Sequence, residues 1–216
     1  MTAGRIVAMI IGVPLLLLII GWFALTMVAY AGQGRFLVDI DLPVHGRPVQ
    51  VAVDSGLLRV GPAADGRLHV TGVARYSLLR SLVSRRETPS FVRVSSRCQL
   101  AVLKCSFRYR VAVPARSPVT LRDGAGEIIG SGLTSRIVSA TDSSGSVTLR
   151  FAVVPRLVTI SDKLGDVTLV LPRGPAAYRI TTRAARGRTT IGVPASASSS
   201  HVIIITSQAG SVTVSE

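Results

Sequence analysis

The stretch LVTISDKLGDVTLVL, residues 157–171, carries the pattern on which the rest of the chain is built. Val158 and Ile160 alternate with polar residues, a polar turn centres on Gly165, and two more apolar residues alternate after it. Alternation with a period of two is typical of strands that bury one face. The stretch therefore predicts two short strands joined at a tight glycine corner, where a residue without a Cβ is favoured.

The same template recurs along the chain. Counted from the glycine, apolar residues occupy positions −7, −5, +2 and +4, and the corner glycines of the copies are Gly56, Gly126, Gly145, Gly165, Gly187 and Gly210. From the second copy onward the corners are 19, 20, 22 and 23 residues apart. Two copies are weaker, because Gly130 takes one apolar position in the second copy and threonines take two in the fifth.

A repeat of this length cannot bury its apolar side alone, so the copies must stack on one another to form a core. We therefore predict an all-β, single-domain β-solenoid over residues 47–216, with repeats of about 20 residues. An antiparallel sandwich is the alternative, because its short strands and turns also recur at regular spacing. Residues 32–46 are interpreted as a linker, and residues 74–106 as an insertion that interrupts the repeat.

Residues 6–31 contain no charged side chain and are bounded by Arg5 and Arg35. As a helix rising about 1.5 Å per residue, this segment is long enough to cross a hydrocarbon core of about 30 Å. A cleaved signal peptide is the alternative, since Ala29-Tyr30-Ala31 fits the small-x-small cleavage rule. We predict an uncleaved single-pass anchor in the plasma membrane, with residues 1–5 in the cytoplasm and the β domain outside.

The formal net charge is +14, from 25 Lys and Arg residues against 11 Asp and Glu residues. Nucleic acid is one partner class for such a balance. Aromatic residues for base stacking are scarce, and no helix-turn-helix or zinc-finger pattern occurs, so no nucleic-acid partner is predicted. An anionic envelope polymer, a lipid surface or a partner protein is expected instead.

Residues 74–106 are rich in arginine, with Arg75, Arg80, Arg85, Arg86, Arg93 and Arg97 against a single Glu87. Leu78, Leu79, Leu82 and Val83 would share one face of a helix. The segment is interpreted as a solvated insertion with a small apolar anchor in the core. The alternative is a basic amphipathic excursion in which these arginines contact an anionic lipid or wall polymer.

Cys98 and Cys105 are the only two cysteines. Their spacing suits no common zinc site, and no histidine lies near them in the sequence. In an oxidising compartment we expect an intrachain disulfide that closes a short loop and holds the insertion in place.

No catalytic motif, metal site or cofactor site is predicted. His45, His69 and His201 are far apart in the sequence, and no nucleophile elbow, phosphate-binding loop or zinc-protease motif occurs. Asp142 and Asp162 both lie three residues before a corner glycine, so stacked repeats would bring them about 5 Å apart. With Asp166 they are the best candidates for a carboxylate cluster, and we interpret them by default as acids in surface turns. The alternative is a glycan-active enzyme that uses Asp142 and Asp162, or a calcium-binding pair at the same two residues.

The apolar N-terminal segment, the cysteine pair, the stretch VAVPARSPVTLRDGAGEI at 111–128 and the serial copies of V-T-I-S-x-x-x-G-D-V-T-L resemble the bacterial putative-adhesin family. The resemblance implies a membrane-anchored β-solenoid of the cell envelope with a binding or structural role, and it supplies no catalytic residues. A subunit of an envelope sensor or assembly complex is a further possibility. Glu216 follows the last copy directly, which predicts pairing of the C-terminal solenoid end with a partner or a second copy.

Overall fold

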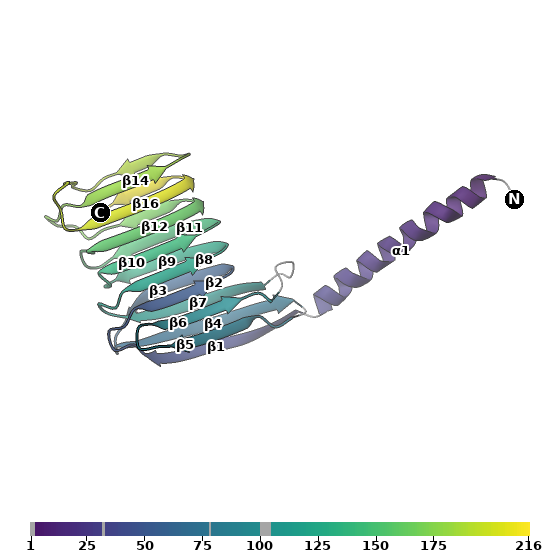
Figure 1. Cartoon of the computed structure of the whole chain (residues 1–216), viewed down its shortest axis with the longest axis horizontal. Helices are drawn as coiled ribbons and strands as arrows, with labels where there is room; N and C mark the ends of the chain where they lie inside the picture. The colour runs from purple at the N-terminus through teal and green to yellow at the C-terminus, as the bar shows by residue number, and fades with distance from the viewer. Residues whose placement is uncertain (1–2, 32, 78, 100–104) are drawn as a thin grey trace.

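The computed structural model describes residues 3–31, 33–77, 79–99 and 105–216, which form one helix and two mixed β-sheets (Figure 1). Helix α1 spans Ala3–Ala31 and extends away from the sheets. In sheet order, the nine-stranded sheet contains β1 (Gln33–Pro43), β4 (Arg67–Ser77), β7 (Cys105–Pro114), β3 (Gly56–Ala63), β9 (Gly126–Leu133), β11 (Gly145–Phe151), β13 (Val167–Val170), β17 (Val212–Ser215) and β15 (Thr189–Ile191). The eight-stranded sheet contains β14 (Arg179–Ala184), β16 (Val202–Ala209), β12 (Leu157–Leu164), β10 (Ile137–Asp142), β8 (Val119–Asp123), β2 (Val49–Val53), β6 (Val92–Arg97) and β5 (Leu82–Glu87).

The all-β character predicted for the domain is confirmed, but the predicted membrane location is not. A membrane-spanning helix needs roughly 20 consecutive apolar residues. Within the residues that the structure describes, no helix combines the length and the apolarity needed to cross a bilayer. The prediction that residues 6–31 form a single-pass anchor in the plasma membrane is therefore wrong. Residues 3–5, expected as a cytoplasmic end, are part of α1, and residues 1–2 lie outside the described part.

The core consists of the apolar positions of the repeat. In three of the copies after β7 all four positions are at most 1% exposed, namely Val138, Ala140, Val147 and Leu149, then Val158, Ile160, Val167 and Leu169, then Ile203, Ile205, Val212 and Val214. Burial at every second residue follows because successive side chains of a strand point to opposite faces. In the weaker copy at Gly126, the side chain of Leu133 occupies the space beside Gly130. The two sheets therefore enclose one apolar interior.

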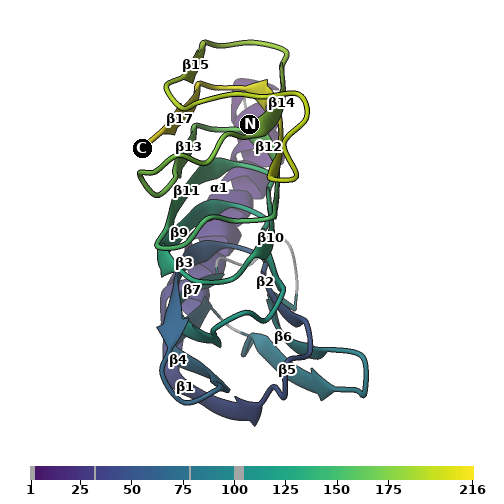
Figure 2. The same cartoon turned by 90° about the vertical axis from the view of Figure 1, so that its left-hand side faces the viewer.

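Each copy places its first strand in one sheet and its second strand in the other. The pairs β8 and β9, β10 and β11, β12 and β13, and β16 and β17 follow this rule, so the chain alternates between the sheets (Figure 2). Equivalent strands pair in parallel and in register, as in Val138 with Val158 and Val147 with Val167. One residue of a copy therefore lies directly above its equivalent in the copy below, at the strand spacing of about 4.8 Å.

The corners between the two strands of a copy are stacked as closely as the backbone permits. A Cβ added to Gly165 would overlap the carbonyl oxygen of Gly145, and a Cβ added to Gly145 would overlap the carbonyl oxygen of Gly126. Gly145 also has a φ of 157°, which L side chains rarely adopt. The corner glycines are thus required by the contact between copies as well as by the local turn.

The spatial order of the strands differs from the sequence order near the C-terminus. The last copy, β16 and β17, lies between β12 and β14 in one sheet and between β13 and β15 in the other. The preceding copy, β14 and β15, is therefore the outermost layer, at the end of the molecule opposite β1 and β5 (Figures 1 and 2).

Residues 74–106, predicted to be an insertion with a helical face, contribute strands to both sheets. The segment contains β5 and β6 and includes the end of β4 and the start of β7. Leu82 and Val83 lie in β5, which forms an antiparallel pair with β6, so the predicted helical face is wrong; Leu78 lies outside the described residues. Strands β6 and β7 pair in parallel with β2 and β3, and they therefore form a layer equivalent to the other copies.

The segment predicted to be a linker, residues 32–46, is mostly strand. β1 pairs with β4 over its whole length, from Gln33 opposite Ser77 to Pro43 opposite Arg67. The alternation of Phe36, Val38 and Ile40 explains this pairing, because their side chains lie on the inner face and pack on the core. Residue 32 is not among the described residues.

Replacing Gly165 with Ala should destabilise the fold, because the new Cβ overlaps the carbonyl oxygen of Gly145 and the two layers must move apart. We expect a loss of about 1–3 kcal/mol in the free energy of unfolding, measured by chemical denaturation. Gly61→Ala is the matched control, because a Cβ on this strand glycine would lie 3.7 Å from its nearest neighbour, the carbonyl oxygen of Ser131. Equal stability of the two variants would contradict the stacked-corner interpretation.

Candidate functional site

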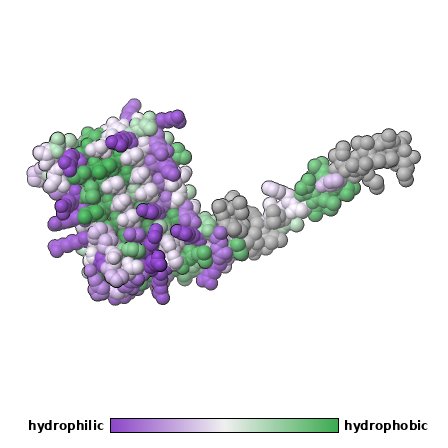
Figure 3. Space-filling model, viewed as in Figure 1, coloured by the Kyte–Doolittle hydropathy of each residue, from purple (hydrophilic) through white to green (hydrophobic). Residues whose placement is uncertain are grey.

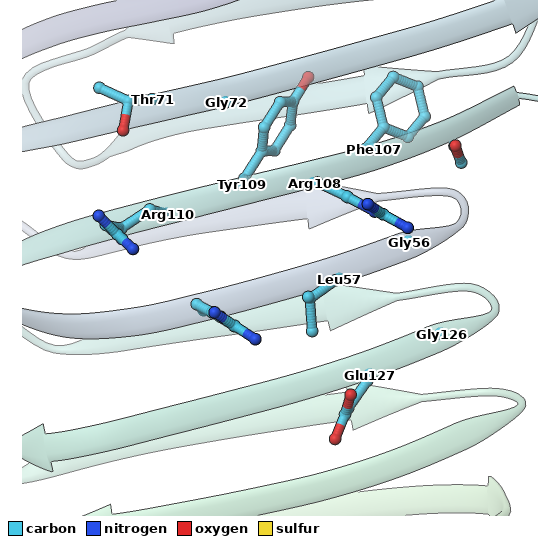
Figure 4. Close-up of a pocket in the computed structure, with 12 residues that line it drawn as sticks. Gly56, Leu57, Thr71, Gly72, Phe107, Arg108, Tyr109, Arg110, Gly126 and Glu127 are labelled. Carbon is cyan, nitrogen blue, oxygen red and sulfur yellow. The ribbon is translucent and has the colours of Figure 1, made fainter.

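A shallow hollow lies on the outer face of the nine-stranded sheet, over four neighbouring strands. Its volume is about 670 Å³, and Figure 4 shows Thr71 of β4, Arg110 of β7, Leu57 of β3 and Glu127 of β9 around it. Arg59 and Arg108 also line it. We call this region the arginine hollow and define it by Arg59, Arg108 and Arg110.

The three arginines of the hollow are brought together by strand pairing. Arg59 and Arg110 face each other across β3 and β7, while Arg108 lies two residues from Arg110 on the same face. In the described part of the chain the ion pairs are Arg47 with Glu87, Arg67 with Asp41, and His69 with Asp41 and Asp65, so none involves the hollow. Like charges directly opposite each other destabilise a sheet. A ligand anion at this point would relieve that repulsion.

The arginines considered as an anion contact are divided between the two sheets. Arg75 lies on β4 of the nine-stranded sheet, whereas Arg85, Arg86, Arg93 and Arg97 lie on the paired strands β5 and β6 of the eight-stranded sheet, where Arg86 is directly opposite Arg93. The guanidinium carbon of Arg80 lies 4.5 Å from the centre of the Phe36 ring, a cation–π contact. Figure 3 likewise shows hydrophilic residues projecting from several edges of the β body in this view.

The predicted disulfide is present between Cys98 and Cys105, whose Cα atoms are 6.0 Å apart. It joins the end of β6 to the start of β7, at the corner where other copies carry a glycine. The backbone N–H of Cys98 donates a hydrogen bond to the carboxylate of Asp54, 3.0 Å away, at the corner of the neighbouring copy. The disulfide therefore closes a longer corner within the stack.

A second notable feature is a column of buried carboxylates, which we call the aspartate column. Asp123 pairs with Asp142, Asp142 with Asp162, and Asp162 with Ser207, on strands β8, β10, β12 and β16. These side chains are between 0 and 3% exposed. The expected closeness of Asp142 and Asp162 agrees with this pairing, but they lie inside the corner and not in a surface turn.

The aspartate column leaves several oxygen atoms without a hydrogen bond. The Oδ1 atoms of Asp123 and Asp142 accept hydrogen bonds from the backbone two residues further on, at 3.1 and 3.2 Å. Their Oδ2 atoms, both carboxylate oxygens of Asp162 and the hydroxyl of Ser207 have no hydrogen-bond partner among the residues that the structure describes. Among the described residues, no group of three or more His, Cys, Asp or Glu side chains is arranged to hold a metal ion.

Burial and mutual repulsion make these carboxyl groups weak acids. Desolvation, together with the charge of Asp142, raises the pKa of Asp123 to about 7 and the pKa of Asp162 to about 6. Desolvation also raises the pKa of Asp142. The column therefore binds protons in the folded state at pH values where the unfolded chain has lost them.

Reasoning from the sequence missed parts of both features. Asp123 lies three residues before Gly126, so the D-x-x-G pattern at 123, 142 and 162 was available in the sequence. Arg59 and Arg110 are 51 residues apart, and no short-range pattern indicates that β7 lies beside β3. Asp166 follows the corner glycine Gly165, and its Oδ1 accepts a hydrogen bond from the Ser211 N–H at 2.7 Å.

Comparison with known proteins gives structural matches alone. No family profile and no curated protein matches the sequence. A solved structure from Clostridium sporogenes, described as a "putative cell adhesion protein", superposes with a TM-score of 0.58 at 13% identity, covering 85% of this chain and 99% of that chain. This match shows a shared fold and agrees with the resemblance to bacterial adhesin-like proteins.

Two further structures described as a "putative adhesin" come from Bacteroides fragilis and Parabacteroides merdae. Their TM-scores are 0.35 and 0.41 at 10% and 9% identity. Each alignment covers 84% of this chain, and 97% and 80% of the respective matched chains. Scores this low support no argument about this chain.

The aspartate column predicts that stability falls as the pH rises. Because the folded-state pKa values lie above the unfolded value near 3.8, the free energy of unfolding should decrease from about pH 4 to pH 7. Asp162→Asn removes one buried charge, and we expect it to raise the melting temperature at pH 8 by about 2–6 °C while flattening the pH dependence. Asp39→Asn on the exposed face of β1 is the control. Identical pH profiles for Asp162→Asn and the wild type would refute the prediction.

Proposed function

We propose that this chain is a non-catalytic binding protein, built as a β-solenoid, that works outside the cytoplasm and holds an anionic polymer against the arginine hollow. The solenoid interpretation is supported by the parallel, in-register pairing of equivalent strands and by the alternation of each copy between two sheets. A stacked repeat of this kind presents long, regular outer faces, which suit contact with an extended ligand.

A location outside the cytoplasm is supported by the disulfide. Cys98 and Cys105 are joined in a bond of the kind that persists in oxidising compartments and is rare in the cytosol. The similar structure from Clostridium sporogenes is described as a "putative cell adhesion protein", a role that belongs to the cell surface. The two observations are independent, since one concerns a covalent bond of this chain and the other its fold.

The main observation in support of an anionic ligand is that Arg59 and Arg110 lie directly opposite each other. Both guanidinium groups are exposed, lie across adjacent strands and have no ion-pair partner in the described residues. Arg108 adds a third charge on the same face, and among the described residues that line the hollow Glu127 is the one acid. Arginine is well suited to phosphate and sulfate groups because its planar fork donates two parallel hydrogen bonds.

Binding is favoured over catalysis because of where the predicted acid pair lies. Asp142 and Asp162 are 1% and 0% exposed, so a glycan chain cannot reach either carboxylate without opening the corner. Glycoside hydrolysis requires both carboxyl groups to flank the scissile bond. The exposed arginine hollow, in contrast, offers positive charge and hydrogen-bond donors at the surface, where an extended ligand can reach them.

The proposal is tested with inorganic polyphosphate as the polyanion and neutral dextran as the reference polymer. We expect polyphosphate to bind, dextran not to bind, and the affinity to fall steeply between 50 and 500 mM salt, conditions that shorten the Debye length from about 14 to 4 Å. Arg59→Ala combined with Arg110→Ala should weaken binding about tenfold or more, measured by calorimetry, since each tenfold corresponds to about 1.4 kcal/mol.

The matched control is Arg122→Ala combined with Arg150→Ala. These two arginines are also exposed strand residues, so the control removes the same net charge from outside the hollow. The control variant should bind polyphosphate nearly as well as the wild type. An equal loss in both double variants would mean that total charge, and not the hollow, holds the polymer.

A further inference from the structure

Strand β14 forms an unprotected end of the eight-stranded sheet. It pairs with β16 on one side, and no strand in the described part of the chain pairs with β14 residues 179–184 on the other side. In Figures 1 and 2 this strand lies at the end of the stack opposite β1 and β5. An edge strand of this length presents a row of unsatisfied backbone groups that can pair with another chain.

The pairing with β16 fixes which backbone groups are free. The N–H of Arg179 donates to the carbonyl oxygen of His201 at 2.8 Å, and the N–H of Ala185 donates to the carbonyl oxygen of Ser207 at 3.0 Å. Alternate residues of a strand bond to opposite sides, so the N–H and C=O groups of Ile180, Thr182 and Ala184 point to the free edge.

The chain itself pairs with Tyr178, the residue directly before β14, on the side of the free edge. The N–H of Tyr178 donates to the carbonyl oxygen of Pro194, and the N–H of Ser196 donates to the carbonyl oxygen of Tyr178, both at 2.9 Å. This contact is a parallel bridge between Tyr178 and Ala195. One residue of a parallel strand therefore already pairs beside this edge. The N–H and C=O groups of Ile180, Thr182 and Ala184 point in the same direction as those of Tyr178.

The apolar layer beneath this edge is incomplete. In the copy below, Ile203 and Ile205 are 0% and 1% exposed, whereas the equivalent Ile180 of β14 is half-buried. Ile191 of β15, in the same outer layer, is 44% exposed. One more strand over β14 would cover part of this layer, and burial of apolar area stabilises association by about 25 cal/mol per Å².

The positive charge of the outer layer, formed by β14 and β15, favours an acidic partner. Residues 172–215 contain no Asp or Glu, and their arginines are Arg173, Arg179, Arg183, Arg186 and Arg188. None of these arginines is in an ion pair with a described residue. Two copies meeting end to end through β14 would bring these positive charges together, which argues against a symmetric dimer. An acidic partner would neutralise them.

We propose that the free edge of β14 binds an extended acidic peptide segment, which adds to the sheet as a further parallel strand. Acidic side chains of the peptide lie beside Arg179 and Arg183 on the outer face, and its alternate apolar side chains lie over Ile180 and Thr182 on the inner face. Backbone hydrogen bonds supply affinity and the alternate side chains supply specificity, as in other cases of strand addition. This site is separate from the arginine hollow and does not depend on the function proposed for it.

The probe is the peptide Val-Glu-Val-Glu-Val with blocked ends. It begins opposite Ile180, because Ser196 of the chain already lies opposite Arg179, and its glutamates then lie opposite Thr181 and Arg183 in a parallel register. Amide hydrogen exchange of the full chain, followed by NMR, should show new protection at Ile180, Thr182 and Ala184 when the peptide is added. Arg179→Glu combined with Arg183→Glu should weaken binding about tenfold or more, since like charges would then face each other. The same peptide with lysine in place of glutamate should not bind.

Two controls separate strand addition from simple charge attraction. Arg122→Glu reverses an exposed charge on β8 of the same sheet, away from the edge, and should leave binding unchanged. Thr182→Pro removes an N–H that points to the free edge and no bond to β16, so it should abolish binding, with the fold verified by the melting temperature. A peptide N-methylated at alternate residues tests the same bonds without altering the protein. Binding that survives both changes, or that brings no new amide protection, would overturn the proposal.

Discussion

The close contact between successive glycine corners fixes how the copies of the repeat lie on one another. Because the carbonyl oxygen of Gly145 occupies the place where a Cβ of Gly165 would be, each copy can sit on the next at one height and in one register. Every position of the repeat therefore becomes a column of equivalent side chains. The inner columns are apolar, and one outer column contains Thr148, Thr168, Thr213 and Thr190 on four neighbouring strands.

The same constraint explains the aspartate column and its cost. In a single corner, an aspartate that accepts a hydrogen bond from the N–H two residues ahead stabilises the turn, as Asp123 and Asp142 do. Stacking in register then places these carboxylates about 4.8 Å apart in the interior, where both desolvation and repulsion oppose ionisation. An aspartate at this position therefore stabilises a single turn, but it destabilises the stack when neighbouring copies carry an aspartate at the same position. Ser207, at the same position in the last copy, ends the column without adding a charge.

Most copies of the repeat could be predicted from the sequence, but the order in which the copies stack in space could not. Alternation around Gly145, Gly165 and Gly210 identified core residues correctly, because burial in a strand follows directly from the period of two. The layer formed by β6 and β7 escaped the template, since a disulfide-closed corner replaces the glycine there. The last copy lies between the third-last and the preceding copy because of which strands pair. The sequence could not predict this order, because every copy carries the same pattern of inward apolar residues.

The arginines illustrate why a charged stretch of sequence is a poor guide to a charged surface in such a fold. A chain that alternates between two sheets distributes a contiguous window over opposite sides of the molecule, as it does with Arg75 and Arg86. A compact patch arises instead from residues that occupy neighbouring positions in different layers, as with Arg59 and Arg110. Strand pairing therefore decides where charge accumulates: Arg86 and Arg93 lie opposite each other because β5 pairs with β6, whereas Arg75 of the same stretch lies in the other sheet.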